Sequence, residues 1–360
     1  MNTLADTLRH FAPLVPEALV SRRALARATD AAALMPAALS NLIYLECRLR
    51  ADDDRVDLAV NVDQRGRGIL AGTAPASAAL GDDVRAHPAW ARVGELARRW
   101  ADPAAPLADA VEGIWLELDD AAGRGAVPAP GVFVDFDHRA LAAGGEGDGA
   151  VRLMADALAP LLGGAVPRDQ AARLRPCLDA LPAGAFVIYL GVMLSRAGAD
   201  ASPPVRVCAM GVKGPALANY LRAAGWPGDP HEIARVAAEL APAGAAMVHL
   251  DVGAAGVAPA LGLELTFARR PQLDGVLAEA GLLDALAARG LCAAEKRDAL
   301  AAWPGYRVET LPHELWPSVV VRRLNHVKVV CGPEGAREAK AYLCVHHEPR
   351  ARRWTPGSIP

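Results

Sequence analysis

Histidine and carboxylate side chains recur at alternate positions in short, apolar-rich segments of this chain. His249 and Asp251 are two residues apart in AMVHLDV, and Glu264, His326 and His346 lie in three further segments of the same kind. Zinc, iron and manganese all accept imidazole and carboxylate ligands. We therefore take His249, Asp251, Glu264 and His346 as one candidate metal site, which requires that separate strands bring these residues together.

Lysine is rare in this chain, and two of its four lysines lie in the last two of these segments. Only four of the 38 basic residues are lysines; Lys328 follows His326 in LNHVKVV, and Lys340 precedes Tyr342 in AKAYLCVHH. An arginine-rich bias makes each retained lysine informative. Alternate positions on a strand share one face of a sheet, so Lys340 and Tyr342 should point the same way.

The segments that carry these side chains read as strands, and the segments between them read as helices. Alternating apolar and polar residues predict strands over residues 41–50, 56–62, 113–119, 131–136, 186–196, 204–212, 246–252, 261–267, 324–330 and 339–347. Apolar spacing of three and four predicts helices over residues 84–100, 107–112, 151–162, 169–181, 215–224, 230–240, 273–289 and 293–303, after a further helical pair at the N-terminus. The order helix, helix, strand, strand repeats five times. We expect one α+β domain over residues 1–348 and a tail over 349–360.

The two faces of the strands differ in chemistry. Tyr44, Glu46 and Arg48 alternate with apolar residues on the first strand, and Trp115 and Glu117 do so on the third. Closing ten antiparallel strands into a barrel removes their edges, with the apolar face toward the helices and the polar face toward a lumen. The alternative is an open sheet with its polar face in water. Because a closed barrel of ten strands is wider than side chains alone can fill, it should hold a ligand.

Composition excludes several classes of protein. The chain is 52% hydrophobic and 22% charged, with a net charge of -3, so no nucleic-acid partner is indicated. The longest apolar run, FVIYLGVML, is about half of what a membrane helix needs, and the N-terminus carries no signal-peptide pattern. The six cysteines have no zinc-site spacing and are expected to be reduced thiols in a cytoplasmic protein.

Five helix–helix–strand–strand units that close into a ten-stranded barrel resemble the aromatic prenyltransferases of the ABBA, or PT-barrel, class. The element AKAYL, with Lys340 and Tyr342, matches the Lys-x-Tyr element of that family. The resemblance implies helices outside a polar lumen, in which a prenyl diphosphate meets an electron-rich acceptor, either a small aromatic or a peptide side chain.

The resemblance also implies roles for individual side chains. Lysine and arginine bind the diphosphate, tyrosine rings shield the allylic cation, and an acidic residue takes the proton from the acceptor. Lys328, Lys340, Tyr342, Arg206 and Arg48 are then expected on the diphosphate side. Tyr44, Trp115 and His326 complete the substrate-binding set, and Glu46 or Glu117 is the expected acid–base group.

Only the last strand keeps the Lys-x-Tyr element, and acids outnumber bases on the face assigned to the lumen. Its five acids are Glu46, Glu117, Asp119, Asp251 and Glu264, against four cations. A trianionic diphosphate in such a lumen calls for a divalent ion, so Mg²⁺ is the one cofactor considered. Two alternatives remain open: metal-dependent modification of a peptide or natural product by the histidine–carboxylate set, and a barrel that binds a peptide or small molecule without turnover.

Overall fold

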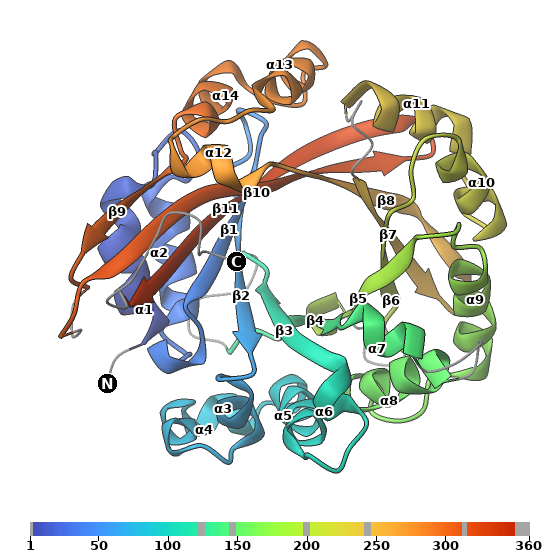
Figure 1. Cartoon of the computed structure of the whole chain (residues 1–360), viewed down its shortest axis with the longest axis horizontal. Helices are drawn as coiled ribbons and strands as arrows, with labels where there is room; N and C mark the ends of the chain where they lie inside the picture. The colour runs from blue at the N-terminus through green and yellow to red at the C-terminus, as the bar shows by residue number, and fades with distance from the viewer. Residues whose placement is uncertain are drawn as a thin grey trace.

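The computed structural model describes residues 3–120, 127–143, 149–196, 202–240, 246–311 and 315–349, and it forms one antiparallel sheet ringed by helices (Figure 1). The strands are β1 (Leu42–Arg48), β2 (Val56–Asp63), β3 (Val111–Leu118), β4 (Gly131–Phe136), β5 (Phe186–Met193), β6 (Val205–Met210), β7 (Ala246–Gly253), β8 (Gly256–Thr266), β9 (Gly305–Glu309), β10 (Ser318–Gly332) and β11 (Gly335–Pro349). Residues 350–360 of the expected tail lie outside the described part.

Ten of these strands close on themselves. β1 to β8 follow one another around the ring, β10 pairs with β8, and β11 pairs with both β10 and β1. Residue pairs such as Glu46 with Tyr342 and Lys328 with Lys340 join β11 to β1 and to β10, and these pairings complete the ring. The predicted ten-stranded antiparallel barrel is confirmed, and the open one-sided sheet is excluded.

Helices cover the outside of the barrel (Figure 1). They are α1 (Leu4–Phe11), α2 (Arg22–Ala32), α3 (Arg67–Ala71), α4 (Asp82–Ala86), α5 (Pro88–Ala101), α6 (Leu107–Ala110), α7 (His138–Ala143), α8 (Ala150–Leu162), α9 (Arg168–Asp179), α10 (Pro215–Ala223), α11 (Pro230–Leu240), α12 (Arg269–Leu273), α13 (Ala280–Ala288) and α14 (Ala294–Ala301). The Ser21 hydroxyl accepts a hydrogen bond from the Ala24 amide at 3.1 Å and so caps α2.

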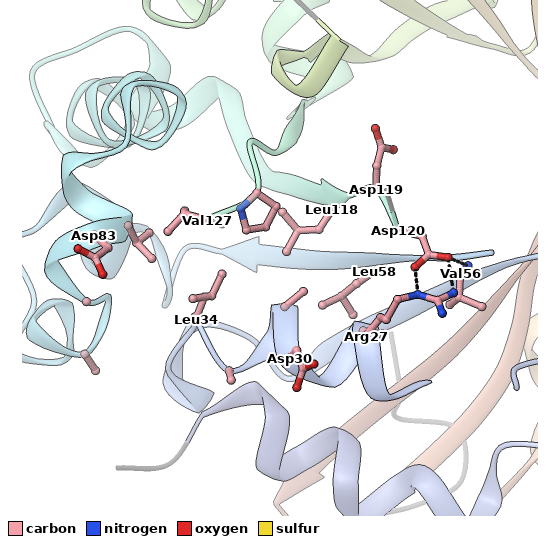
Figure 2. Close-up of a pocket in the computed structure, with 17 residues that line it drawn as sticks. Arg27, Asp30, Leu34, Val56, Leu58, Asp83, Leu118, Asp119, Asp120 and Val127 are labelled. Atoms are coloured by element: carbon pink, nitrogen blue, oxygen red, sulfur yellow. Dashed lines mark hydrogen bonds and ion pairs between the residues drawn. The ribbon is translucent and has the colours of Figure 1, made fainter. Parts of the chain in front are cut away.

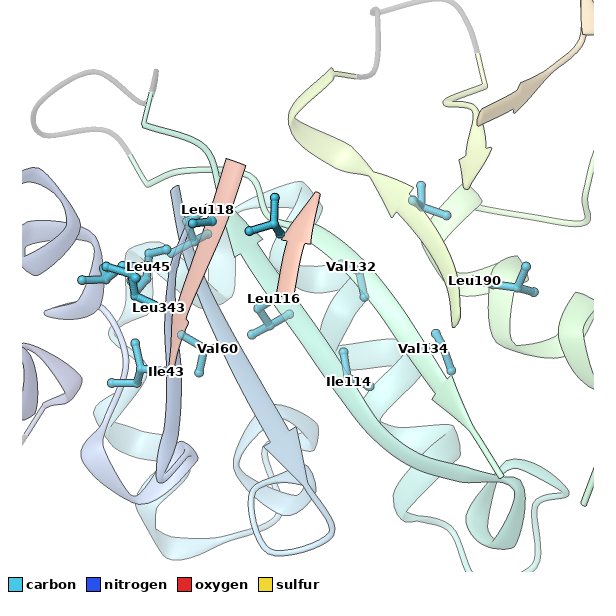
Figure 3. Close-up of a cluster of buried hydrophobic side chains, with 14 of the residues drawn as sticks. Ile43, Leu45, Val60, Ile114, Leu116, Leu118, Val132, Val134, Leu190 and Leu343 are labelled. Carbon is cyan, nitrogen blue, oxygen red and sulfur yellow. The ribbon is translucent and has the colours of Figure 1, made fainter. Parts of the chain in front are cut away.

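The main apolar core lies between the strands and these helices. Figure 3 shows side chains such as Ile43, Leu116, Val134 and Leu343 that strands contribute to it, and all four are at most 2% exposed. Burial of the apolar face against helices leaves the alternate residues of each strand facing inward. The apolar set of every strand therefore secures the barrel, and the other set forms the lumen.

Several predicted boundaries were wrong, and glycine or proline explains most of them. The two last hairpins turn tightly at Gly256 and Gly335, whose φ angles of 124° and 109° favour glycine, so β8, β10 and β11 extend into stretches predicted as loops. The predicted helix over 273–289 is broken beside Gly275, and that over 84–100 is broken before Pro88. Val111 already belongs to β3, and the short strand β9 was not predicted.

One irregularity in β10 matters for the lumen. Leu324 lies opposite Leu343 and Val327 lies opposite Ala341, so two residues, Asn325 and His326, fall opposite the single residue Tyr342. Such a bulge reverses which residues face inward on its two sides. Val327 packs into the outer core, as does Leu324 on the other side of the bulge, and Arg323 consequently faces inward.

Candidate active site in the barrel lumen

The lumen encloses a cavity of about 690 Å³, which is within the usual range for small-molecule sites. Of the residues predicted for the lumen, those that line the cavity are Tyr44, Trp115, Glu117, His249, Glu264, His326, Lys328, Tyr342 and His346. Glu46, Arg48, Arg206, Asp251 and Lys340 lie at the end of the barrel where β1 ends and β2 begins. We call this end the floor and the opposite end the rim.

The floor is a network of buried ion pairs. Arg48 Nη1 lies 2.7 Å from Asp57 Oδ2 and 3.2 Å from Glu46 Oε1, and Lys340 Nζ lies 2.8 Å from Glu46 Oε1. Burial alone would raise the pKa of Glu46, but Lys340 and Arg48 lower it well below its usual range. Burial opposes the charge on Lys340, yet Glu46 raises its pKa. Both predicted cations are therefore neutralised by carboxylates of the chain itself.

Arg206 is neutralised in the same way. Its Nε and Nη2 donate to the two carboxylate oxygens of Asp251 at 2.6 and 2.8 Å. This two-point pairing is the strongest geometry available to the two groups. Asp251, which the sequence suggested as a metal ligand, is thus bound to an arginine.

A third cluster gathers around Glu264 in the wall of the cavity. Its Oε1 lies 3.0 Å from His249 Nε2, 3.4 Å from His326 Nε2 and 3.8 Å from Lys328 Nζ. Burial lowers the pKa of His249 to about 4, so its imidazole is neutral at pH 7. Burial, with the nearby charge of Arg206, also lowers the pKa of Lys328. Of the cations predicted for the diphosphate, Lys328 is the one that lines the cavity.

Aromatic rings form a belt across the middle of the lumen. The ring centroids of Tyr44 and Trp115 are 4.6 Å apart, those of Tyr44 and Tyr342 are 6.5 Å apart, and His326 lies 3.8 Å from Tyr342. Phe133, Tyr189, Met210 and Met247 continue the lining of the cavity. We call Tyr44, Trp115, Tyr342 and His326 the aromatic belt. Its faces suit a flat, electron-rich ligand or a cation.

Two carboxyl groups that line the same cavity as the belt have raised pKa values. Burial, together with the charge of Glu46, raises the pKa of Glu117 to about 7. Burial, with Glu112 nearby, raises that of Asp135 to about 8. Glu117 can therefore exchange a proton at physiological pH, whereas Glu46 stays ionised. Of the two acids predicted for proton transfer, Glu117 has the better matched pKa.

The predicted metal set does not come together in the structure. His249 contacts Glu264, but Asp251 is bound by Arg206 and His346 lies near the rim beside Leu42. Within the described part of the chain, one set of three groups has ligand atoms all within 4.8 Å of one another: Glu46, Asp57 and Glu117. Their oxygen donors are of the kind that Mg²⁺ binds. The sequence pattern did not single out Asp57, because it lies next to the strand end.

The rim carries two arginines that sequence reasoning missed. Arg323 is only 6% exposed, lines the cavity, and has an Nε atom with no hydrogen-bond partner among the described residues. Arg269, the first residue of α12, also lines the cavity and is exposed. Strict alternation from Val327 places Arg323 on the outer face. The sequence does contain one signal of the bulge: strict alternation from Val327 places position 324 on the inward face, yet that residue is the apolar Leu324.

A second cavity, of about 630 Å³, lies outside the barrel between α2, α4 and the strands β2 and β3 (Figure 2). Its lining includes the apolar side chains of Leu34, Leu58 and Leu118. The charged groups drawn together there, Arg27 and Asp120, form a two-point ion pair. Asp120 also accepts a hydrogen bond from the Val56 amide at 3.2 Å, so the pair secures α2 to the strand ends.

All six cysteines are free and buried. In the described residues, none of the helices has the length and apolar character needed to span a bilayer.

Comparison with known proteins assigns this chain to no family. No protein-family model matches the chain, and no curated protein matches it. Among solved structures, the chain is similar to AnaPT from Neosartorya fischeri. The match has a TM-score of 0.49 and 14% identity, and covers 97% of this chain and 92% of that one. At this level the assignment of the barrel rests on the strand pairing described above, and the chemistry rests on the lumen.

Proposed function

We propose that this chain transfers a prenyl group from a prenyl diphosphate to an electron-rich aromatic acceptor, either a small molecule or a peptide side chain, inside the lumen. The observation that carries the proposal is that the aromatic belt and Glu117 line one cavity: Glu117 lies two residues from Trp115 on the inward face of β3, and its pKa is raised to about 7. These are the two elements that the reaction needs most. One stabilises an allylic cation, and the other removes a proton from the alkylated ring.

The reaction would divide between these groups as follows. The bond between the allylic carbon and the diphosphate oxygen breaks, and the bonding electrons leave with the diphosphate, beside Lys328. The faces of Tyr44 and Tyr342 stabilise the cation and exclude water. A carbon of the acceptor ring forms the new bond, and ionised Glu117 accepts the proton that this carbon loses.

The charge of the diphosphate needs more than Lys328, since Arg48, Arg206 and Lys340 are already paired. Glu46 and Asp57, which belong with Glu117 to the set of three described above, would be the described groups to hold Mg²⁺, and their oxygen donors fit that ion; Glu117 then keeps its carboxylate for the proton. Burial and the charge of Glu46 raise the pKa of Asp57 to about 6, which is a sign of carboxylate repulsion that a cation relieves. When bound, Mg²⁺ supplies positive charge to the leaving group.

A second candidate function is a barrel that binds an aromatic ligand without turnover. It is favoured by the complete pairing of the floor cations, which leaves a diphosphate few direct partners.

Calorimetry with prenyl diphosphates of five to fifteen carbons, with and without Mg²⁺, tests the proposal. We expect binding that Mg²⁺ strengthens and that Lys328→Met weakens roughly tenfold, as loss of one charge-assisted contact should. The exposed Lys213 provides a matched control, since Lys213→Met should bind as the native chain does. If no prenyl diphosphate binds under either condition, the transferase proposal is wrong and the binding function takes its place.

A further inference from the structure

Arg323 and Arg48 are equally buried, each with 6% of its surface exposed, yet only Arg48 has carboxylate partners. No described carboxylate lies within ion-pairing distance of Arg323 or of Arg269. A buried charge without a partner is costly, and proteins seldom retain one without a use for it. The rim therefore carries a buried positive charge that no described carboxylate neutralises.

We propose that the rim binds the carboxylate of an aromatic substrate, with Arg323 and Arg269 on the carboxylate and the aromatic belt on the ring. This site deepens the proposed function, on which it rests only in using the lumen as a substrate chamber. It assigns the acceptor to a chemical class: an aromatic compound with a carboxylate on a short chain.

The two parts of this site lie within reach of each other. Arg323 is the cross-strand partner of Cys344, and Cys344 packs with Tyr44 and Tyr342. Burial raises the pKa of Tyr44, and the positive charges of Arg323 and Arg269 oppose this rise, which places both arginines near the belt. A ligand with its ring on Tyr44 can thus reach the guanidinium of Arg323.

The charge of the surrounding lumen selects a carboxylate over a phosphate. Glu264 and Glu117 line the same cavity, and Glu264 keeps its charge because His249 and His326, against the effect of burial, hold its pKa well below the usual range. A single negative charge on a planar group meets the fork of Arg323 and little repulsion. Unless a divalent ion accompanies it, a group with two or three charges meets the same two arginines and more repulsion from the carboxylates.

The test compares 3-(4-hydroxyphenyl)propionate with its amide by calorimetry, without any prenyl diphosphate, so that binding and transfer can fail separately. The native chain should bind the carboxylate about tenfold more tightly than the amide, because only the carboxylate makes charge-assisted hydrogen bonds. Equal affinity for the two compounds, or no binding of either at millimolar concentration, would overturn the proposal without any variant.

Variants then locate the contact. Arg323→Gln should remove most of the preference for the carboxylate over the amide, leaving at most the smaller share that Arg269 contributes, and should leave the affinity for the amide unaffected. Arg322→Gln is the matched control, since Arg322 lies next to it in the chain but stacks on Trp303, which packs in the outer core. Inorganic pyrophosphate is the third probe. If it binds more tightly than the carboxylate and loses that affinity in Arg323→Gln, the rim is a phosphate site and the carboxylate assignment is wrong.

Discussion

The floor and the rim of the lumen treat buried arginine in opposite ways. At the floor, Arg48 is held by Glu46 and Asp57, and Arg206 is held by Asp251. At the rim, Arg323 has the same exposure as Arg48 but no carboxylate partner among the described residues. Burial and charge alone therefore do not identify a binding group in this barrel. What distinguishes the rim is that its positive charge is still available.

The comparison between floor and rim also shows where the acidic residues of the inward face are neutralised. Much of the negative charge that the sequence assigns to the inward face is consumed at the floor by Arg48, Lys340 and Arg206. Glu117 differs from the floor acids: its nearest cation is Arg196, with 3.7 Å between Nη2 and Oε1, and burial with the charge of Glu46 raises its pKa to about 7. We therefore assign catalysis to the middle of the lumen and a stabilising role to the ion pairs of the floor.

The largest effect should come from breaking the floor. Arg48→Met removes the shared partner of Glu46 and Asp57; Glu46 keeps Lys340, but the buried Asp57 is left without a cation, so the free energy of unfolding should fall by about 3–5 kcal/mol. Urea denaturation measures this change. Arg50→Met, at an exposed residue two positions along, is the control and should change the free energy by less than about 0.5 kcal/mol. A small loss in Arg48→Met would mean that the floor pairs do not stabilise the fold.

Glu117→Gln should remove prenyl transfer almost completely, by about 10²–10⁴-fold, because amide groups do not accept the proton. In the native chain, the transfer rate should rise with pH through about 7, as Glu117 ionises. Product formation measured from pH 5 to 9 checks both results. Glu95→Gln, on the exposed face of α5, should leave the rate unchanged. A flat pH profile in the native chain would count against Glu117 as the base.

Stability should also depend on pH through Glu117. Its folded pKa of about 7 is above the ordinary value of 4.5, so the folded state holds this proton more tightly than the unfolded chain does. The contribution of Glu117 is therefore fully present below pH 4.5 and is lost as pH rises through about 7. Unfolding curves of native and Glu117→Gln chains should diverge over this window. Parallel curves would show that its pKa is not raised.

The smallest effect is expected at the exposed edge of the rim. Arg269→Gln should weaken binding of the aromatic carboxylate only about two- to fivefold, because water screens an exposed charge, and should leave the free energy of unfolding unchanged. Calorimetry at low and high salt measures the change in affinity for the carboxylate. The salt dependence should be smaller in the variant than in the native chain; an unchanged dependence would remove Arg269 from the site.

Alternation was enough to predict the barrel and most of its lumen. Tyr44, Trp115, Glu117, Lys328 and Tyr342 face inward as expected, because the period of a strand leaves only two faces and the apolar one must meet the helices. The sequence did not predict which residues of neighbouring strands lie opposite each other. Which carboxylate meets which cation depends on register, and so the closed pairs of Lys340 with Glu46 and of Arg206 with Asp251 were not foreseen.

The bulge in β10 marks the other limit of the sequence. A single extra residue at Asn325 and His326 reverses the alternation and turns Arg323 inward, while each residue taken alone has ordinary strand character. Bulges are common next to binding sites because they re-aim side chains. The bulge at Asn325 and His326 thus supplies the buried arginine that the regular pattern does not.

The central claim is that the arginine at the floor is paired with carboxylates and the buried arginine at the rim is not. The free energy of unfolding of Arg323→Met, measured in urea beside that of Arg48→Met, tests it most directly. We expect Arg323→Met to be as stable as the native chain or up to about 1 kcal/mol more stable, since it removes a buried charge that has no carboxylate partner among the described residues. A loss of stability comparable to that of Arg48→Met would contradict the account, because it would mean that the fold already neutralises Arg323.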